Sequence, residues 1–300
     1  MPSKALSPAE WGAIALVVVI WGVNNAAAKV LTGTLDPVLV GGVRFLIGSA
    51  CLLPFVRPPF PPIRQLFWLV LCGGPLHFAL VYWGFQLADN LSAYSVVLQL
   101  WIPFVAVLAW VLLRERMGRA ELAGLAIAFV GVAYMALDGG GVSDWDSILV
   151  GTIASFFWAA AVVLARRTVD LPPLKMQGII SFVAAPVMLA GGLARQPDGL
   201  AVLAGSPPLI WACLIWAGAV STVIATGLVF WLVQGREAGR VTPYFLVTPL
   251  VSGLIGVAML GDVLTPGIWI GGAATLAGVA LVAIAERRRK RAALALTEPA

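Results

Sequence analysis

The stretch Trp21-Gly22-Val23-Asn24-Asn25-Ala26-Ala27-Ala28-Lys29 places two amides and one ammonium group inside a long apolar segment, residues 11–35. Polar side chains at membrane depth are costly to bury, so they usually face other protein groups or line a water-filled cavity. On a helix Trp21, Asn25 and Ala28 share a face, and Asn24 flanks it. The stretch therefore predicts one wall of a solute pathway, and the alternative is a pair of amides that tie helices together.

The composition of the whole chain excludes a soluble globular protein. Hydrophobic residues make up 61% of the chain and charged residues only 11%, whereas soluble domains carry about 25% charged residues. Long apolar runs alternate with short loops, and strand-type alternation is absent, so we expect an all-α membrane protein and not a membrane β-barrel. We expect ten spans, each near the roughly 20 residues that a bilayer requires: 11–35, 37–56, 64–87, 91–113, 119–137, 147–165, 173–194, 208–233, 241–260 and 265–285.

The placement of lysine and arginine predicts the topology. If the N-terminus is cytoplasmic, nearly all of the 19 basic residues fall in cytoplasmic segments. Only Arg195 falls on the opposite side, and Lys29 and Arg44 lie within spans. This asymmetry predicts that both termini are cytoplasmic. The tail, residues 286–300, is then a basic segment that anchors the topology at the lipid headgroups.

The chain also repeats itself. A tryptophan is followed eight residues later by a cation at Trp21 and Lys29, and again at Trp158 and Arg166. Later correspondences are Pro103 with Pro249, and Glu115 with Asp262. These matches predict two five-helix units, residues 11–137 and 147–285, joined by a linker at 138–146. Because five is odd, the second unit begins on the opposite side of the membrane, which predicts the inverted repeats found in many secondary transporters.

With its Trp-Gly-x-Asn start, its proline and closing acid in and after the fourth span, and its Gly-x6-Gly-Val fifth span, the chain resembles the drug/metabolite transporter superfamily in its ten-span form with two EamA-type units. Within that superfamily it looks most like the YddG-type amino acid exporters. The resemblance implies export of aromatic and other neutral amino acids. The second unit departs from the pattern at Ala159 and at Gly261-Asp262, so we expect more of the polar recognition in the first unit.

Candidate site residues are polar or aromatic groups at membrane depth. His77, the only histidine, could bond a carboxylate, serve as a coupling site or be a satisfied core residue. Trp101 lies mid-span beside Pro103, and we expect it to line the cavity with Trp158 as its partner from the second unit; simple packing is the alternative. The expected substrate-binding set is Asn24, Asn25, His77, Tyr82, Tyr94, Gln99, Trp101, Trp158, Tyr244, Thr248 and Ser252, with Lys29 and Arg44 as gating residues near the exit that could instead extend to the headgroups.

The sequence contains no mid-membrane carboxylate, no phosphate-binding loop and no convergent catalytic or metal-ligand groups. We therefore expect neither enzyme activity nor a cofactor nor a metal site, and no nucleic-acid partner. Our hypothesis is a monomeric secondary transporter in a bacterial inner membrane that exports a small zwitterionic amino acid by alternating access, through facilitated diffusion or with coupling at His77. The alternatives are a sugar-phosphate or other metabolite carrier of the same superfamily, and a non-transporting integral membrane protein.

Overall fold

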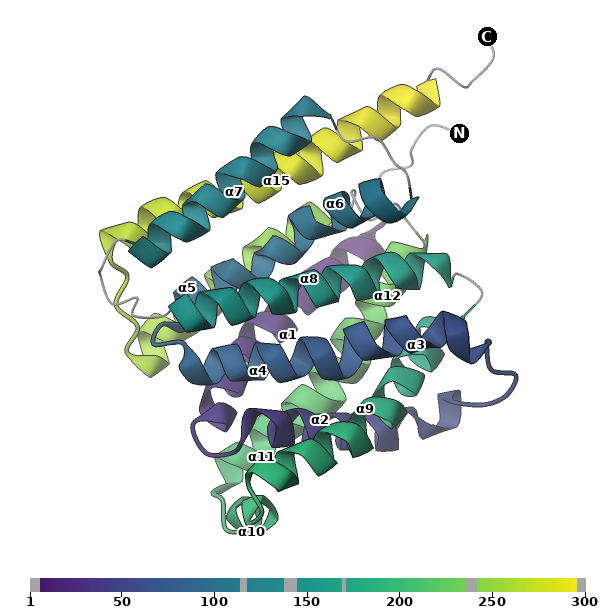
Figure 1. Ribbon diagram of the computed structural model, residues 1–300, viewed down its shortest axis with the longest axis vertical. Helices are drawn as coiled ribbons and strands as arrows, with labels where there is room; N and C mark the ends of the chain where they lie inside the picture. The colour runs from purple at the N-terminus through teal and green to yellow at the C-terminus, as the bar shows by residue number, and fades with distance from the viewer. Residues whose placement is uncertain (1–5, 114–117, 138–144, 169–170, 236–241, 296–300) are drawn as a thin grey trace.

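The computed structural model describes residues 6–113, 118–137, 145–168, 171–235 and 242–295, and every regular element in this part is helical (Figure 1). The longer helices lie side by side, and their connections gather at two ends of the molecule. The α-helices are α1 (Pro8–Thr32), α2 (Pro37–Leu52), α3 (Ile63–Leu71), α4 (His77–Leu87), α5 (Leu91–Val97), α6 (Trp101–Leu113), α7 (Arg119–Leu137), α8 (Trp145–Arg167), α9 (Pro173–Arg195), α10 (Gly199–Ala204), α11 (Pro208–Ile215), α12 (Thr226–Gly235), α14 (Thr248–Ile255) and α15 (Pro266–Ala295).

Eight helical segments of the described part are long and apolar enough to cross a membrane, and Tyr244–Leu260 is a shorter apolar helix. These nine follow the predicted spans closely. The helix α7 covers the predicted span at 119–137 but is not among the eight, so the count of ten spans stays a prediction. Residues 138–144 of the expected linker and Glu115 lie outside the described residues. The helix α15 continues to Ala295, ten residues beyond the predicted end of its span, and α10 was not expected.

Local sequence explains where the first helices begin. The Ser7 hydroxyl accepts a bond from the Glu10 amide at 3.3 Å, and the Glu10 carboxylate accepts one from the Ser7 amide at 2.7 Å, which forms a capping box around Pro8. At the next turn Asp36 accepts bonds from the first amides of α2, and its second carboxylate oxygen lies 2.8 Å from Arg195 Nε. These caps satisfy amides that have no partner within the helix.

Six short segments depart from α-helical geometry. The segments η2 (Cys72–Leu76), η4 (Trp216–Ala225) and η6 (Gly256–Leu260) are π-helical, and η1 (Leu53–Phe55), η3 (Leu98–Leu100) and η5 (Thr242–Val247) are 3-10 turns, of which η1 only closes α2. Both η3 and η5 come shortly before a proline, Pro103 and Pro249, whose missing amide removes one bond from the preceding turn. Each such segment rotates the residues after it relative to those before it, so α-helical spacing does not hold across it.

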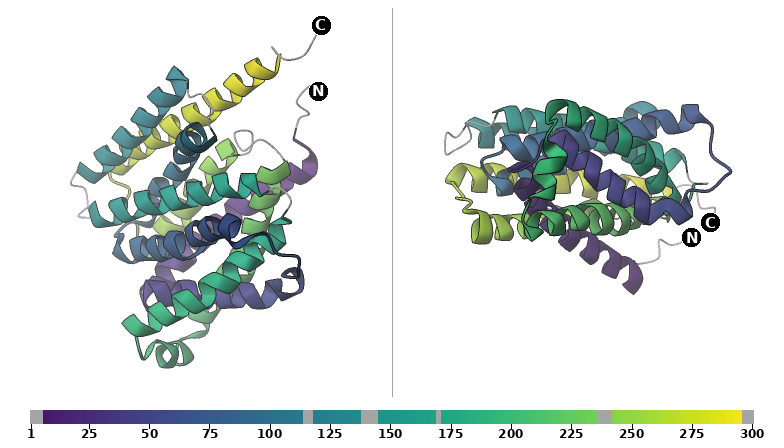
Figure 2. Two further views of the ribbon diagram at one scale, coloured as in Figure 1. Left: turned by 45° about the vertical axis from the view of Figure 1, so that its right-hand side comes forward. Right: turned by 90° about the horizontal axis from the view of Figure 1, so that it is seen from below.

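Helices from the two predicted units pack against each other throughout the bundle. Such contacts join α2 with α9, α4 and α6 with α8, α1 with α14 and η4, and α7 with α15. Figures 1 and 2 show α7 and α15 side by side at one edge of the molecule. Their backbones approach closely, because a methyl group added at Gly124 would lie 2.7 Å from the Gly278 carbonyl oxygen. Small residues at this contact let the two helices approach.

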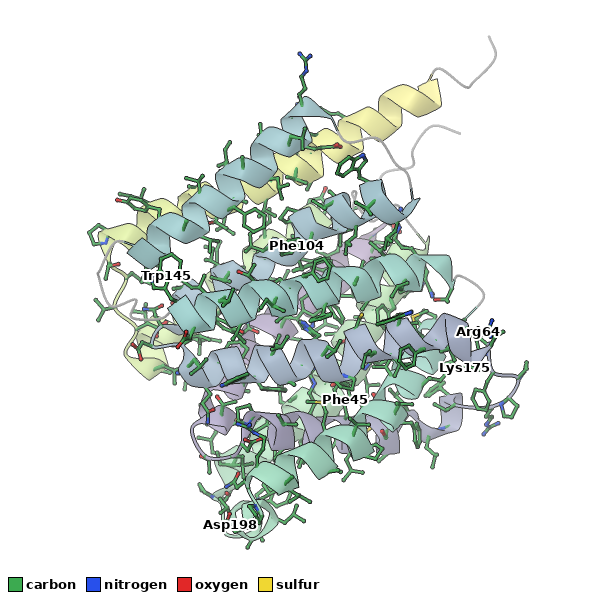
Figure 3. All side chains as sticks on the ribbon, viewed as in Figure 1. Phe45, Arg64, Phe104, Trp145, Lys175 and Asp198 are labelled. Atoms are coloured by element: carbon green, nitrogen blue, oxygen red, sulfur yellow. The ribbon has the colours of Figure 1, made fainter. Side chains whose placement is uncertain are left out.

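Charged side chains lie at both ends of the bundle. Figure 3 labels Arg64 and Lys175 at one end, and Trp145 and Asp198 at the other. The first turn of α1 and the last turns of α15 lie at the end that carries Arg64 and Lys175.

Candidate transport cavity

A cavity of about 90 Å³ lies inside the bundle, lined by side chains from α1, α2, α4, η3, α6, α8, η4, α12 and α14. Both predicted units contribute to the lining. Clefts that hold drug-sized ligands enclose roughly 300–1,000 Å³, so this cavity is a contracted one. It has room for several water molecules, and a larger molecule would need the surrounding helices to separate.

Arg44 enters the cavity from the middle of α2 with only 2% of its surface exposed. Its Nε donates to the Thr222 hydroxyl at 2.7 Å, Nη1 to the Tyr82 hydroxyl at 3.1 Å, and Nη2 to the Ser221 hydroxyl at 3.3 Å. The ring of Phe78 lies 4.2 Å from the guanidinium carbon, in range for a cation–π contact. Among the described residues Arg44 has no ion pair, so the guanidinium is a buried cation with neutral partners.

Two of the three hydroxyls that hold Arg44 come from the π-helical segment η4. The wide π turn lets the Thr222 hydroxyl donate to the carbonyl of Ala217, five residues earlier, at 2.7 Å. That bond fixes the hydroxyl oxygen where it accepts from Arg44. Single π-helical turns are often found at functional sites, and here the segment places two hydroxyls, those of Ser221 and Thr222, against one guanidinium. Our sequence-based expectation placed Arg44 near an exit, and the structure instead places it in the cavity wall.

Three buried oxygens of the cavity wall have no hydrogen-bond partner in the structure: Asn24 Oδ1 from α1, Gln99 Oε1 from η3 and Thr248 Oγ1 from α14. Most buried polar atoms are paired, and an unpaired one lowers stability. Each of these atoms is therefore available to a molecule that enters the cavity.

Aromatic rings form another part of the wall. Trp21 and Trp158 meet edge to face with centroids 6.2 Å apart, and Phe230 stacks on Trp158 at 6.2 Å. Trp101 lines the cavity as expected, but its nearest ring is Phe245, at 6.3 Å. The predicted pairing of Trp101 with Trp158 is thus replaced by two separate aromatic contacts on the same wall.

His77 lies beside Trp158, with ring centroids 5.0 Å apart, and lines the cavity. Its Nδ1 is 2.8 Å from the Ala154 carbonyl oxygen. A carbonyl can only accept, so Nδ1 carries a hydrogen, and in the neutral ring Nε2 is an acceptor.

Asn25 differs from its neighbour Asn24, because its amide nitrogen is engaged by two other helices. It donates to Ser252 Oγ at 3.0 Å and to Ser95 Oγ at 3.3 Å, which joins α1 to α14 and α5. Ser252 in turn lies 3.3 Å from the Thr248 carbonyl oxygen. Both readings of the opening stretch describe Asn25, which ties helices together and also lines the cavity, and the cavity wall describes Asn24.

Five predicted residues do not line the cavity: Tyr82, Tyr94, Tyr244, Ser252 and Lys29. Tyr82 is fully buried beside it as a partner of Arg44. The Tyr94 hydroxyl donates to the Val81 carbonyl at 3.2 Å, and Tyr244 packs on Trp11 with centroids 4.6 Å apart. Lys29 donates to the carbonyl oxygens of Phe85 and Ala88 at the end of α4. The 3-10 segments explain two of these placements, because η3 separates Tyr94 from Trp101 and Tyr244 itself lies within η5.

Trp21 lines the cavity as the opening stretch predicted, and six further lining residues were absent from the predicted set: Phe78, Val81, Leu98, Ser155, Ser221 and Thr226. Two of them could have been inferred from their positions in the sequence. Ser155 lies three residues before Trp158 and so shares its helical face, and Phe78 follows His77 directly. The position of Ser221 depends on the π-helical register of η4, which the sequence does not reveal.

Comparison with known proteins gives consistent relationships. The model of the EamA-like transporter family matches residues 11–137 and 146–284. The chain is 26% identical to a "Probable amino-acid metabolite efflux pump" of Salmonella typhimurium, over 92% of this chain and 95% of the relative. It is 30% identical to a "Probable terminal-alkyne amino-acid exporter" of Streptantibioticus cattleyicolor, over 92% and 94%. A crystal structure of a protein with 18% identity superposes with a TM-score of 0.62, over 94% of this chain and 99% of the other, which shows a shared fold.

Proposed function

The chain belongs to the EamA-like transporter family, and we propose that it is a secondary transporter that exports small zwitterionic solutes, in particular neutral or aromatic amino acids. The family is one of transporters and not of enzymes, and the chain is a multi-pass protein of the bacterial inner membrane. Relatives named as exporters of amino acids and their metabolites support this class of cargo.

The observation that carries the proposal is the buried guanidinium of Arg44 in the cavity wall. Among the described residues its partners are hydroxyls and rings, which leave the positive charge without an opposite charge. Burial of an uncompensated charge is unfavourable, and a carboxylate that enters the cavity would relieve it through charge-assisted hydrogen bonds. The tryptophans beside it offer apolar surface to a side chain.

We place transport in two inverted five-helix units, residues 11–137 and 147–285, that move about this cavity. Three observations support the arrangement. The helix pairs across the two units are reciprocal, since α1 meets η4 as α4 meets α8. The third span of each unit contains a π-helical segment, η2 or η4, and 3-10 turns precede both Pro103 and Pro249. The contracted cavity requires the helices to separate before cargo enters, as alternating access demands.

We place both termini in the cytoplasm. The support is the end of the bundle where α1 begins and α15 ends, which also carries Arg64 and Lys175, because cytoplasmic loops are enriched in lysine and arginine.

A counterflow assay tests the function directly. Liposomes that contain the purified protein are loaded with unlabelled amino acids, and labelled phenylalanine or leucine is added outside. We expect transient accumulation of label in protein-containing vesicles, and loss of accumulation in Arg44→Gln but not in Arg195→Gln, a surface control that is paired with Asp36. If no amino acid accumulates but a sugar phosphate does, the cargo class is wrong and the family assignment stands.

A further inference from the structure

We propose that Asn24, Gln99 and Thr248 form the site that binds the ammonium group of the cargo, so that the carrier selects solutes with both a free ammonium group and a carboxylate. This inference rests on the proposed function and deepens it. Arg44 would take the carboxylate, and the three oxygens would take the opposite end of the same molecule.

The three oxygens are alike in burial and in lack of partners. Asn24 is 8% exposed, Gln99 5% and Thr248 2%. In the described part of the chain they are the only buried side-chain oxygens without a hydrogen-bond partner, and all three residues line one cavity. Because unpaired buried oxygens lower stability, three of them around a single space point to a ligand that pairs them.

The chemistry of an ammonium group fits this set. It carries three N–H donors and no acceptor, and the cavity offers three oxygens from three different elements. Donors with a positive charge form hydrogen bonds that are about twice as strong as neutral ones. No carboxylate among the described residues lines the cavity. Because Arg44 donates its hydrogen bonds to other partners, the three oxygens can accept hydrogen bonds from a donor on the cargo.

The contacts around Asn25 hold together the elements that carry the three oxygens. Its amide joins α1, which carries Asn24, to α14, which carries Thr248, and to α5, which leads directly into the η3 turn with Gln99. Arg44 is held separately by hydroxyls of η4 and α4. The two charged groups of a zwitterion would therefore be bound by two different groups of helices, both of which contact α1.

Analogues of one cargo test the inference without any substitution. Counterflow of labelled phenylalanine is measured in liposomes against phenylpyruvate, which keeps the carboxylate but has no ammonium group, and against phenethylamine, which has no carboxylate. We expect each analogue to compete at least about tenfold more weakly than unlabelled phenylalanine, the size of one lost hydrogen bond to a charged group. Equal competition by phenylpyruvate and phenylalanine would overturn the inference.

Apolar substitutions of similar shape assign the effect to residues. Gln99→Met and Thr248→Val should raise the half-saturating phenylalanine concentration about tenfold and leave the inhibition by phenylpyruvate unchanged. Thr32→Val and Gln86→Met are the controls, because Thr32 bonds within its own helix and Gln86 lies outside the cavity. Thermal unfolding shows that the variants fold, and loss of an unpaired oxygen should not lower their midpoint.

Two further results would contradict the ammonium site. Equal weakening of phenylalanine and phenylpyruvate in Thr248→Val would mean that the hydroxyl only shapes the cavity. Recovery of phenylalanine transport in that variant by high sodium concentration would mean that the oxygens hold a metal cation. If the unsubstituted protein moves no amino acid at all, the proposed function itself fails, which the first assay separates from these outcomes.

Discussion

Arg44 Nε donates to the Thr222 hydroxyl over 2.7 Å and so connects α2 to the π-helical segment η4 across 178 positions of sequence. Tyr82 and Ser221 complete the set of hydroxyls around the same guanidinium. The cation is thus fixed by elements of both predicted units, and its position depends on how these elements are packed.

Thr222→Val tests whether this bond positions the guanidinium. The substitution keeps the shape but removes the acceptor, so we expect a loss of about 1.5–3 kcal/mol of stability, typical of a hydrogen bond to a charged group. Amino acid transport should weaken in parallel. Thr222→Ser should retain both properties. Ser49→Ala is a matched control, because that hydroxyl only bonds the Phe45 carbonyl of its own helix. A Thr222→Val variant as stable and as active as the unsubstituted protein would show that Nε needs no partner here.

The adjacent amides Asn24 and Asn25 should behave in opposite ways. Asn25→Leu removes two bonds between helices and should lower the free energy of unfolding by about 1–2 kcal/mol, since such bonds in membranes average about 0.6 kcal/mol each. Asn24→Leu removes an oxygen without a partner, so it should reduce transport and leave stability unchanged or higher. Thermal unfolding in detergent together with counterflow measures both effects. Equal destabilisation by the two substitutions would contradict the assignment.

Lys29→Met tests a structural role for the cation of the opening stretch. Its ammonium group donates to two carbonyls at the end of α4, where positive charge is favourable. Its loss should lower stability by about 0.5–2 kcal/mol and leave the half-saturating substrate concentration unchanged. An increase in that concentration would instead support the gating role that the sequence suggested.

Gly124→Ala tests the close approach of α7 and α15. The added methyl group would meet the Gly278 carbonyl oxygen at 2.7 Å, which forces the two helices apart. We expect a loss of about 1–3 kcal/mol, as for overpacked cores. Gly12→Ala should be neutral or mildly stabilising, because nothing lies within 4 Å of the new methyl group. The thermal unfolding midpoints of the two variants, compared with that of the unsubstituted protein, test this prediction.

The helices and most of their limits were predictable because apolar runs, prolines and capping residues act locally. Asp36-Pro37 marks the start of α2 in the sequence as it does in the structure. The continuation of α15 to Ala295 was not predictable from hydropathy, because a helix can extend into water beyond the end of its apolar segment.

The cavity was predictable only in part, because the residues that share a helix face can be inferred from the sequence only if α-helical spacing holds along the whole span. Seven residues of the expected set line the cavity: Asn24, Asn25, His77, Gln99, Trp101, Trp158 and Thr248. Tyr94 and Tyr244 were expected there too, but a 3-10 turn separates Tyr94 from Trp101, and Tyr244 lies within a 3-10 segment. Gln99 reaches the cavity although it does not share the α-helical face of Trp101. The role of Arg44 depends on contacts with η4, far away in sequence.

The charge of Arg44 also bears on what drives the carrier. Moving one elementary charge through a membrane potential of 100 mV changes its free energy by about 2.3 kcal/mol. A zwitterion adds no net charge to the cavity, so the protein carries the same charge when it is loaded as when it is unloaded. The electrical potential would then neither assist nor oppose movement of the cargo itself. The difference between the solute concentrations inside and outside the cell would set the direction of net transport.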